Sequence, residues 1–248
     1  MTIYSHWLKT INTKILPIVL LLIINTLQSC HNDKTEPINP YNYYPLKIGQ
    51  FSIYEITEVV YSAGQKDPVI SNWQEKDEIN SVSTNSVGIP IYLISTSRRN
   101  NSNSYWQKVK QYNLDQYPDK IIQNIDNESI VPMIFPIDKS LNWNGYMYLN
   151  LNTTDNRYGY NFKYENVGES FDTGLSNFEK TLKVVERVDT SGLTKYNFAS
   201  KHYANGVGLI LDQQADFDYL QINGELSGYK VISSGKRRIK RLVEYSKN

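Results

Sequence analysis

Hydrophobic and polar residues alternate along much of this chain with the period of two that is typical of β-strands. Tyr158, Tyr160, Phe162 and Tyr164 would share one face of a strand, while Gly159, Asn161 and Lys163 would share the other. Further strands are predicted at residues 50–61, 91–96, 146–151, 178–188 and 206–211. No segment carries a hydrophobic stripe of helical period over a helical length. The pattern predicts an all-β fold, with an antiparallel, strongly curved sheet in an open barrel or a sandwich, and few or no helices beyond the N-terminal segment.

The N-terminal segment has the order of features found in export signals. Lys9 and Lys14 precede an unbroken apolar run at residues 15–24, and a small residue, Ser29, lies shortly after it. Ten apolar residues are too few for a transmembrane helix, which needs about 20. Residues 1–29 are therefore predicted to be a signal peptide that is removed on export.

The residues Leu27-Gln28-Ser29-Cys30 resemble a bacterial lipobox, in which the cysteine receives a diacylglycerol thioether and becomes the mature N-terminus. Cys30 is the only cysteine in the chain, so it has no partner for a disulfide bond or a thiolate metal site. Cys30 is therefore predicted to be the lipidation site that holds the protein on a membrane. Ordinary cleavage near Ser29 and an uncleaved signal anchor are the alternatives.

The mature chain divides into a tether and a folded domain. Residues 30–40 are polar, charged and proline-bearing, which predicts a flexible tether. Residues 41–248 are predicted to form a β-rich globular domain. The aromatic-Pro-aliphatic phrase at 44–46 recurs at 135–137, so two similar halves, about 41–130 and 131–248, are one interpretation, and chance is the other. In enteric bacterial lipoproteins, an aspartate after the lipidated cysteine is a signal for retention in the inner membrane. Here His31 follows Cys30, so the outer membrane is favoured, and the sequence does not indicate which of its leaflets holds the anchor.

Composition supports β-structure and excludes one class of partner. The chain has 20 Tyr and 4 Trp among 248 residues, with 40% hydrophobic and 21% charged residues. The formal net charge of +1 becomes −1 when Lys9 and Lys14 leave with the signal peptide. A near-neutral exported protein has no overall field that would attract nucleic acid.

Three phrases along the chain resemble a family of uncharacterised Bacteroidota lipoproteins. They are Tyr44-Pro45-Leu46-Lys47-Ile48-Gly49, then Phe135-Pro136 followed by Trp143-Asn144-Gly145, and finally Tyr203-Ala204-Asn205-Gly206-Val207-Gly208-Leu209. The resemblance covers most of the mature chain and implies a lipid-anchored envelope protein. It implies no activity, because the family has none established.

Candidate chemistry is sparse. The mature chain holds only His31 and His202, so neither a multi-histidine zinc site nor a cysteine nucleophile is expected, and no catalytic, cofactor or metal residue is predicted. His202 could act as a base, but a structural histidine is favoured. Asp212, Asp216 and Asp218 form the densest acidic group; Asp216 and Asp218 would share a strand face, although solvated carboxylates are favoured.

Two other features could contact a ligand. The basic run at residues 236–241 could meet lipid headgroups or an acidic glycan, but an exposed sheet edge protected by Lys and Arg is favoured. The aromatic residues Trp106 and Trp143, together with those at 158–164, could line a sugar-stacking or apolar site, although a hydrophobic core is favoured.

Two functional hypotheses remain. The first is a membrane-anchored envelope lipoprotein that acts as a non-enzymatic binding or structural module, with a glycan, a protein or an apolar molecule as its partner. The alternative is a hydrolase that cleaves a glycan through carboxylates such as Asp216 and Asp218. Enzymatic activity is the less favoured of the two.

Overall fold

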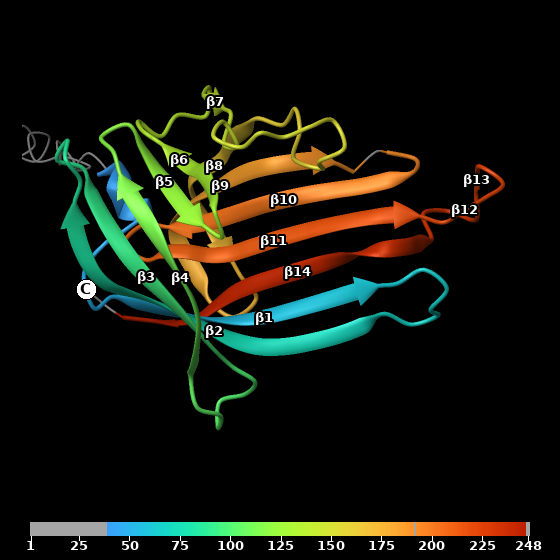
Figure 1. Cartoon of the computed structure of the whole chain (residues 1–248), viewed down its shortest axis with the longest axis horizontal. Coiled ribbons are helices and arrows are strands. Elements are labelled where there is room, and N and C mark those ends of the chain that lie inside the picture. The colour runs from blue at the N-terminus through green and yellow to red at the C-terminus, as the bar shows by residue number, and fades with distance from the viewer. Residues whose placement is uncertain (1–38, 191, 247–248) are drawn as a thin grey trace, which may run out of the picture. The chain divides into compact units, whose positions relative to one another are not determined.

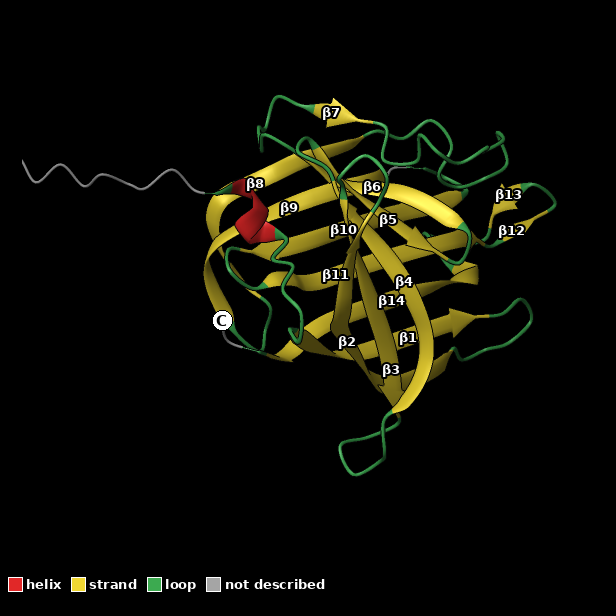
Figure 2. Cartoon of the chain, turned by 60° about the vertical axis from the view of Figure 1, so that its left-hand side comes forward, coloured by secondary structure: helices red, strands yellow, loops and turns green. Residues whose placement is uncertain are grey.

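The computed structural model describes residues 39–190 and 192–246, which form an all-β unit, as the sequence predicts. Twelve strands make one antiparallel sheet in the order β6-β5-β4-β3-β2-β1-β14-β11-β10-β9-β8-β7, and β12 pairs with β13 in a small second sheet. The sheet curves so strongly that it nearly closes into a barrel (Figure 1). The only helix in the described residues is the short 3-10 turn η1 (Pro40–Tyr43), drawn in red in Figure 2.

The strands are joined mostly by short loops. In the first half they are β1 (Phe51–Tyr61), β2 (Val69–Thr84), β3 (Pro90–Arg99), β4 (Gln107–Gln116), β5 (Lys120–Ile125) and β6 (Glu128–Ile134). In the second half they are β7 (Asn142–Trp143), β8 (Phe162–Asp172), β9 (Asn177–Asp189), β10 (Lys195–Ala204), β11 (Gly208–Tyr219), β12 (Gln221–Ile222), β13 (Glu225–Leu226) and β14 (Ile232–Tyr245).

Two meanders meet in the middle of the sheet. Strands β1 to β6 run outwards in one direction, while β14, β11, β10, β9, β8 and β7 run outwards in the other. The two halves are joined where β1 pairs with β14, from Ser52 opposite Tyr245 to Tyr61 opposite Gly235. The strand that carries the basic run is therefore central, and the prediction that residues 236–241 form an exposed sheet edge was wrong.

Side chains and a loop bridge the two ends of the sheet. The Trp143 indole N–H donates to the Val131 carbonyl at 2.8 Å, and the Val131 amide donates to the Gly145 carbonyl at 2.8 Å. The Tyr164 hydroxyl donates to the carbonyl of Ile134 and accepts from its amide, at 2.6 and 2.9 Å. Gly145 is required here because a Cβ at this position would overlap the Phe162 ring. These contacts form the seam of the sheet.

Two predicted strand segments were wrong, and polar side chains explain both. Residues 146–151 form turns, since the Asn144 side chain accepts from the Tyr146 amide at 3.0 Å and the Leu149 amide donates to the Tyr146 carbonyl. Strand β8 begins only at Phe162, so Tyr158 and Tyr160 lie in the preceding loop. There the side chains of Asn152 and Asp155 accept from backbone amides two residues ahead, which favours turns over a strand.

The other expected strands lie close to their predicted positions. Residues 91–96 lie inside β3 and residues 178–188 inside β9, whereas residues 206–207 form a turn before β11. No helix within residues 39–190 and 192–246 is long and apolar enough to cross a membrane. The predicted signal peptide, the lipidation site Cys30 and most of the tether lie outside the described residues.

Candidate functional site

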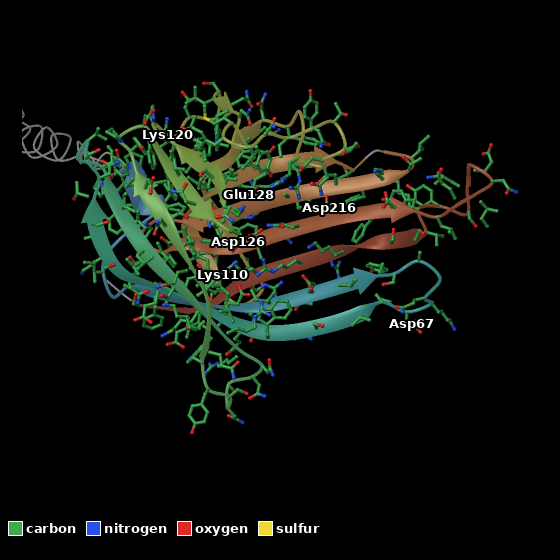
Figure 3. All side chains as sticks on the ribbon, in the orientation of Figure 1. Asp67, Lys110, Lys120, Asp126, Glu128 and Asp216 are labelled. Carbon is green, nitrogen blue, oxygen red and sulfur yellow. The ribbon has the colours of Figure 1, made fainter. Side chains whose placement is uncertain are left out.

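The concave face of the sheet encloses a cavity of about 270 Å³, which we call the inner cavity. Its walls come from both meanders, because side chains of β1 to β6 face side chains of β10, β11 and β14 across it (Figure 3). Successive side chains of a strand point to opposite faces, so residues two positions apart share the concave face. Glu75 and Asp77 of β2, for example, both line the cavity.

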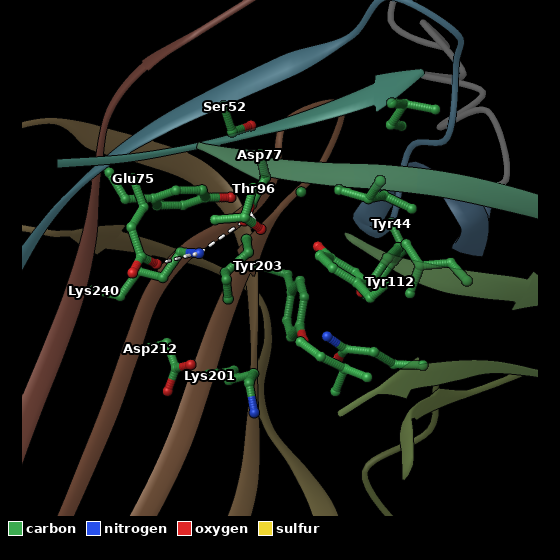
Figure 4. A pocket seen from close by; sticks show the side chains of 18 of the residues that line it. Tyr44, Ser52, Glu75, Asp77, Thr96, Tyr112, Lys201, Tyr203, Asp212 and Lys240 are labelled. Carbon is green, nitrogen blue, oxygen red and sulfur yellow. Dashed lines mark hydrogen bonds and ion pairs between the residues drawn. The ribbon is translucent and has the colours of Figure 1, made fainter. Parts of the chain in front are cut away.

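Tyrosines form much of one wall of the inner cavity. Tyr44, Tyr112 and Tyr203 lie next to one another in Figure 4, and the rings of Tyr44 and Tyr203 have centroids 5.6 Å apart. Tyr54 lines the same space from β1. Burial raises the pKa of all four hydroxyls well above the ordinary value, so each stays protonated and can donate a hydrogen bond at neutral pH.

A buried carboxylate, Glu75 of β2, organises the cations of the lining. Glu75 is 3% exposed and accepts from the Trp73 indole at 2.9 Å, Arg98 at 3.1 Å, Arg238 at 3.1 Å and Lys240 at 3.5 Å. Burial alone would raise the pKa of Glu75, but these four partners, Lys240 foremost, outweigh it and lower the pKa to about 2. We call Glu75, Arg98, Arg238 and Lys240 the Glu75 cluster.

Two buried lysines complete the charged lining. Lys240 also donates to Asp77 at 2.8 Å, and Asp77 accepts from the Thr96 hydroxyl at 2.6 Å (Figure 4). Lys201 is paired with Glu186. Burial would lower the pKa of both lysines, but the neighbouring carboxylates reverse the effect, so both remain charged. The inner cavity is therefore lined by fixed charges and phenols, together with apolar side chains such as Ile79, Leu114 and Leu209.

The three phrases that carry the family resemblance lie near one another. The Gly206 amide donates to the Asn42 carbonyl at 2.8 Å, beside the contact between Tyr44 and Tyr203. The rings of Phe135 and Tyr41 are in tilted contact, with centroids 4.5 Å apart. Residues from the first and third phrases line the inner cavity.

The structure places the predicted acidic group on β11. Asp212 lines the inner cavity, and Asp216 lines a second cavity beside it. Asp216 is paired with Arg187 at 3.4 Å, and Asp218 with Lys195 at 3.8 Å. Burial raises the pKa of Asp216, although Arg187 opposes the shift. Across residues 39–190 and 192–246, no three His, Cys, Asp or Glu side chains gather as a metal-binding group.

The basic run is divided between two faces. Lys236, Arg238 and Lys240 line the cavities, whereas the intervening Arg237 and Ile239 have the opposite parity on β14 and lie on the convex face. The concave face of β14 therefore carries three cations at alternate positions. Their cross-strand neighbours on β11 are Asp216, Gln214 and Asp212 in turn.

His202 lies outside the cavity. Its neighbours Lys201 and Tyr203 line the inner cavity, while His202 is 5% exposed and stacks on Phe171 with ring centroids 4.0 Å apart. Burial, and to a smaller extent Lys183, lowers its pKa to about 4. His202 is therefore a neutral, packed side chain at pH 7, as the favoured structural interpretation predicts.

The aromatic candidates have structural positions. Trp143, Phe162 and Tyr164 belong to one buried cluster at the seam. Trp106 lies under the guanidinium of Arg99, whose Cζ is 4.2 Å from the ring centroid, and Tyr158 is half-exposed. None of these five side chains lines the inner cavity.

Sequence reasoning missed most of the cavity lining. Glu75, Asp77, Lys110, Tyr112 and Gln214 were not singled out. The sequence offers no clear signal for them, because the charged runs at 75–78 and 236–238 place charge on both faces of their strands.

Comparison with known proteins gives distant structural similarity only. No family model matches the sequence, and no curated protein matches it. Solved structures similar to the chain include a predicted lipoprotein from Parabacteroides distasonis ATCC 8503, with a TM-score of 0.41 and 10% identity over 82% of this chain and 98% of that one. A predicted exported protein with a YmcC-like fold from Bacteroides fragilis NCTC 9343 has a TM-score of 0.37 and 10% identity over the same shares. A LolA superfamily protein from Nitrosomonas europaea has a TM-score of 0.20 and 8% identity over 85% and 91%. These similarities are too distant to assign a function.

Proposed function

We propose that this protein is a lipoprotein of the cell envelope, anchored in the outer membrane through Cys30, whose concave face binds a polar ligand without transforming it. The observation that carries the binding proposal is the charged and phenolic lining of the inner cavity. Binding sites are concave and present a few fixed polar groups to their ligand, and this cavity has both properties.

The lining favours a polar ligand over an apolar one. An apolar ligand would cover polar groups of the lining such as Asp212, Gln214 and the tyrosine hydroxyls without offering them hydrogen bonds, which is unfavourable. A ligand rich in hydroxyl groups can instead donate to the carboxylates and accept from the phenols and ammonium groups. A glycan has this chemistry.

The carboxylates on β11 support binding better than hydrolysis. A glycosidase holds its two carboxyl groups on either side of the scissile bond. Asp216 and Asp218 lie two residues apart on one strand, and each is paired with a cation, Arg187 or Lys195. This arrangement presents both groups from the same side, so it does not provide an opposed acid and base.

A blocking substitution tests the binding proposal. Gln214 lines the inner cavity and has only its own-strand neighbour Asp212 as a side-chain partner among the described residues, so Gln214→Trp should fill the space while leaving the strand intact. Gln213→Trp, at the adjacent position on the convex face, is the matched control. We expect calorimetry with a panel of neutral and acidic oligosaccharides to detect binding that Gln214→Trp weakens at least about tenfold and Gln213→Trp preserves.

Palmitate is the apolar probe in the same experiment. Binding of palmitate that Gln214→Trp abolishes, with no saccharide bound, would contradict the polar-ligand proposal. If neither class of probe binds the parent chain, the cavity is not a binding site for sugars or fatty acids and the proposal fails.

A mass measurement tests the anchor. The acyl chains on a lipidated cysteine contribute about 0.8 kcal/mol for each methylene buried in the bilayer, enough in combination for stable attachment. We expect the protein purified from membranes to begin at Cys30 with added acyl mass, and Cys30→Ala to move the protein to the soluble fraction. An unacylated soluble species from the parent chain would refute the anchor.

A further inference from the structure

A second cavity of about 270 Å³ lies against the inner cavity, and we call it the mouth. Glu75, Lys110, Gln214 and Arg238 line both, so the two spaces are continuous. The remaining lining of the mouth is Glu58, Trp73, Arg98, Asp216 and Lys236. In Figure 3, Lys110 and Asp216 lie on opposite walls of the concave face.

Two lysines at the mouth have little internal compensation. The nearest carboxylate oxygen to Lys110 is on Asp126, at 3.9 Å, and the Asp126 side chain is 74% exposed. Such an exposed, long contact stabilises the charge only weakly. Lys236 lies opposite Asp216 on β11 but forms no direct ion pair with any residue in the described part of the chain. Both ammonium groups are therefore available to an external anion.

Two arginines at the mouth are held in place with spare donors. Arg98 and Arg238 each use one Nη2 to bind a different oxygen of Glu75, both at 3.1 Å. The Arg98 guanidinium also lies over the Trp73 ring, with Cζ 4.5 Å from the centroid. A guanidinium has five N–H donors, so most donors on each arginine are free of contacts with Glu75. The Glu75 cluster thus fixes the positions of two guanidinium groups and leaves most of their N–H donors available to a ligand.

Acceptors for hydroxyl groups lie on the other wall. The Oδ1 atom of Asp216 is buried and has no hydrogen-bond partner among the described residues, while Oδ2 is paired with Arg187. Among residues 39–190 and 192–246, the Gln214 side chain donates hydrogen bonds only to Asp212 of its own strand. The mouth therefore combines donors suited to an anion with acceptors suited to neutral hydroxyl groups.

We infer that the mouth is a subsite for an acidic sugar. The sugar carboxylate binds Lys110 and Lys236 with the free donors of Arg98 and Arg238, and neighbouring hydroxyl groups donate to Asp216 Oδ1 and contact Gln214. This inference rests on the proposed binding function and names the class of ligand. It predicts that affinity depends on the sugar's charge and falls as salt rises.

Strand β14 supplies a matched control for the charge. Lys236 lines the mouth and the next residue, Arg237, lies on the convex face, and both side chains are exposed. Lys236→Met and Arg237→Met therefore change the net charge equally, and only the first removes a cation from the mouth.

Calorimetry with tetragalacturonic acid and its fully methyl-esterified counterpart, which has the same rings without the charge, tests the inference on the full chain in detergent. We expect the acid to bind at least about tenfold more tightly than the ester, the worth of one hydrogen bond to a charged group. Lys236→Met should remove most of that difference, whereas Arg237→Met should retain it.

Failure of the acidic-sugar subsite can be distinguished from failure of the proposed binding function. Equal affinity for acid and ester, both lost in Gln214→Trp, would overturn the acidic subsite and leave the binding proposal standing. If Lys236→Met and Arg237→Met reduce the preference for the acid equally, that preference comes from the overall charge of the protein and not from the mouth. This result would overturn the subsite. If neither tetramer binds, the acidic-sugar inference is overturned, and the neutral saccharides of the panel decide the binding proposal.

Discussion

Replacing Glu75 by glutamine is expected to lower the free energy of unfolding by about 3 kcal/mol, because it removes the one charge shared by Arg98, Arg238 and Lys240. Removing one partner of a buried ion pair costs about 3–5 kcal/mol. The lower end applies because the Arg98 and Arg238 side chains are 45% and 30% exposed and can turn towards water. Urea unfolding at pH 7 measures the change.

Glu78→Gln is the control for this prediction. Glu78 lies on the same strand and pairs with Lys76 at 2.6 Å, but its side chain is 37% exposed. A surface pair of this kind contributes less than about 1 kcal/mol. Equal losses from the two substitutions would contradict a special role for Glu75.

The Glu75 effect depends on pH in a defined direction. The folded pKa is about 2 and the ordinary value is 4.5, so the unfolded state binds the proton more tightly. The stabilisation from the carboxylate is therefore complete above pH 4.5 and is lost as the pH falls through 4.5 towards 2. The stability difference between the parent chain and Glu75→Gln should accordingly shrink over this interval.

Trp143→Ala is expected to destabilise the domain by about 3–5 kcal/mol, the range for removing a large buried aromatic side chain. Trp143 is 9% exposed, packs edge-on or tilted against the rings of Phe162 and Tyr164, and donates its indole N–H to the Val131 carbonyl. The substitution leaves a void at the seam and removes one bridge between the sheet's two ends. Hydrogen exchange should accelerate first in β6 and β8.

Trp106→Ala provides the comparison for the same change of residue outside the core. Trp106 has a cation-π contact with Arg99, which is worth about 0.5–1 kcal/mol at an exposed site. A loss at Trp106 as large as that at Trp143 would show that the seam is not the basis of the effect.

The fold class could be predicted because apolar residues at alternate positions reveal a strand wherever one face is buried. The start of strand β8 is the clearest case: Phe162 and Tyr164 are buried, and Lys163 between them is exposed, as the alternation predicts. The loop before β8 shows where the period misleads. Tyr158 and Tyr160 continue the alternation, but the Asx turns at Asn152 and Asp155 hold this part of the chain out of the sheet.

The cavity lining was harder to predict, because the interior of this sheet is not apolar. Strand β14 carries charged side chains on both faces, Lys236 towards the mouth and Arg237 outwards. Its sequence therefore shows no alternation of polar and apolar residues that would reveal which face is buried. An exposed edge was the simplest interpretation of such a strand. Only the pairing of β14 with both β1 and β11, which joins residues far apart in sequence, makes it central.

The central place of β14 also sets the order in which the domain can be assembled. Strand β1 is among the first to emerge during synthesis or export, yet one of its two neighbours is the last strand in the described sequence. Until residues 232–245 arrive, the first meander has an unpaired inner edge, and Glu75 and Asp77 lack their partner Lys240. Such long-range pairing slows folding, since a large loop must close before the contact forms. A newly synthesised chain therefore passes through a stage in which the inner edge of β1 is open to pairing with other chains until its final strand is inserted.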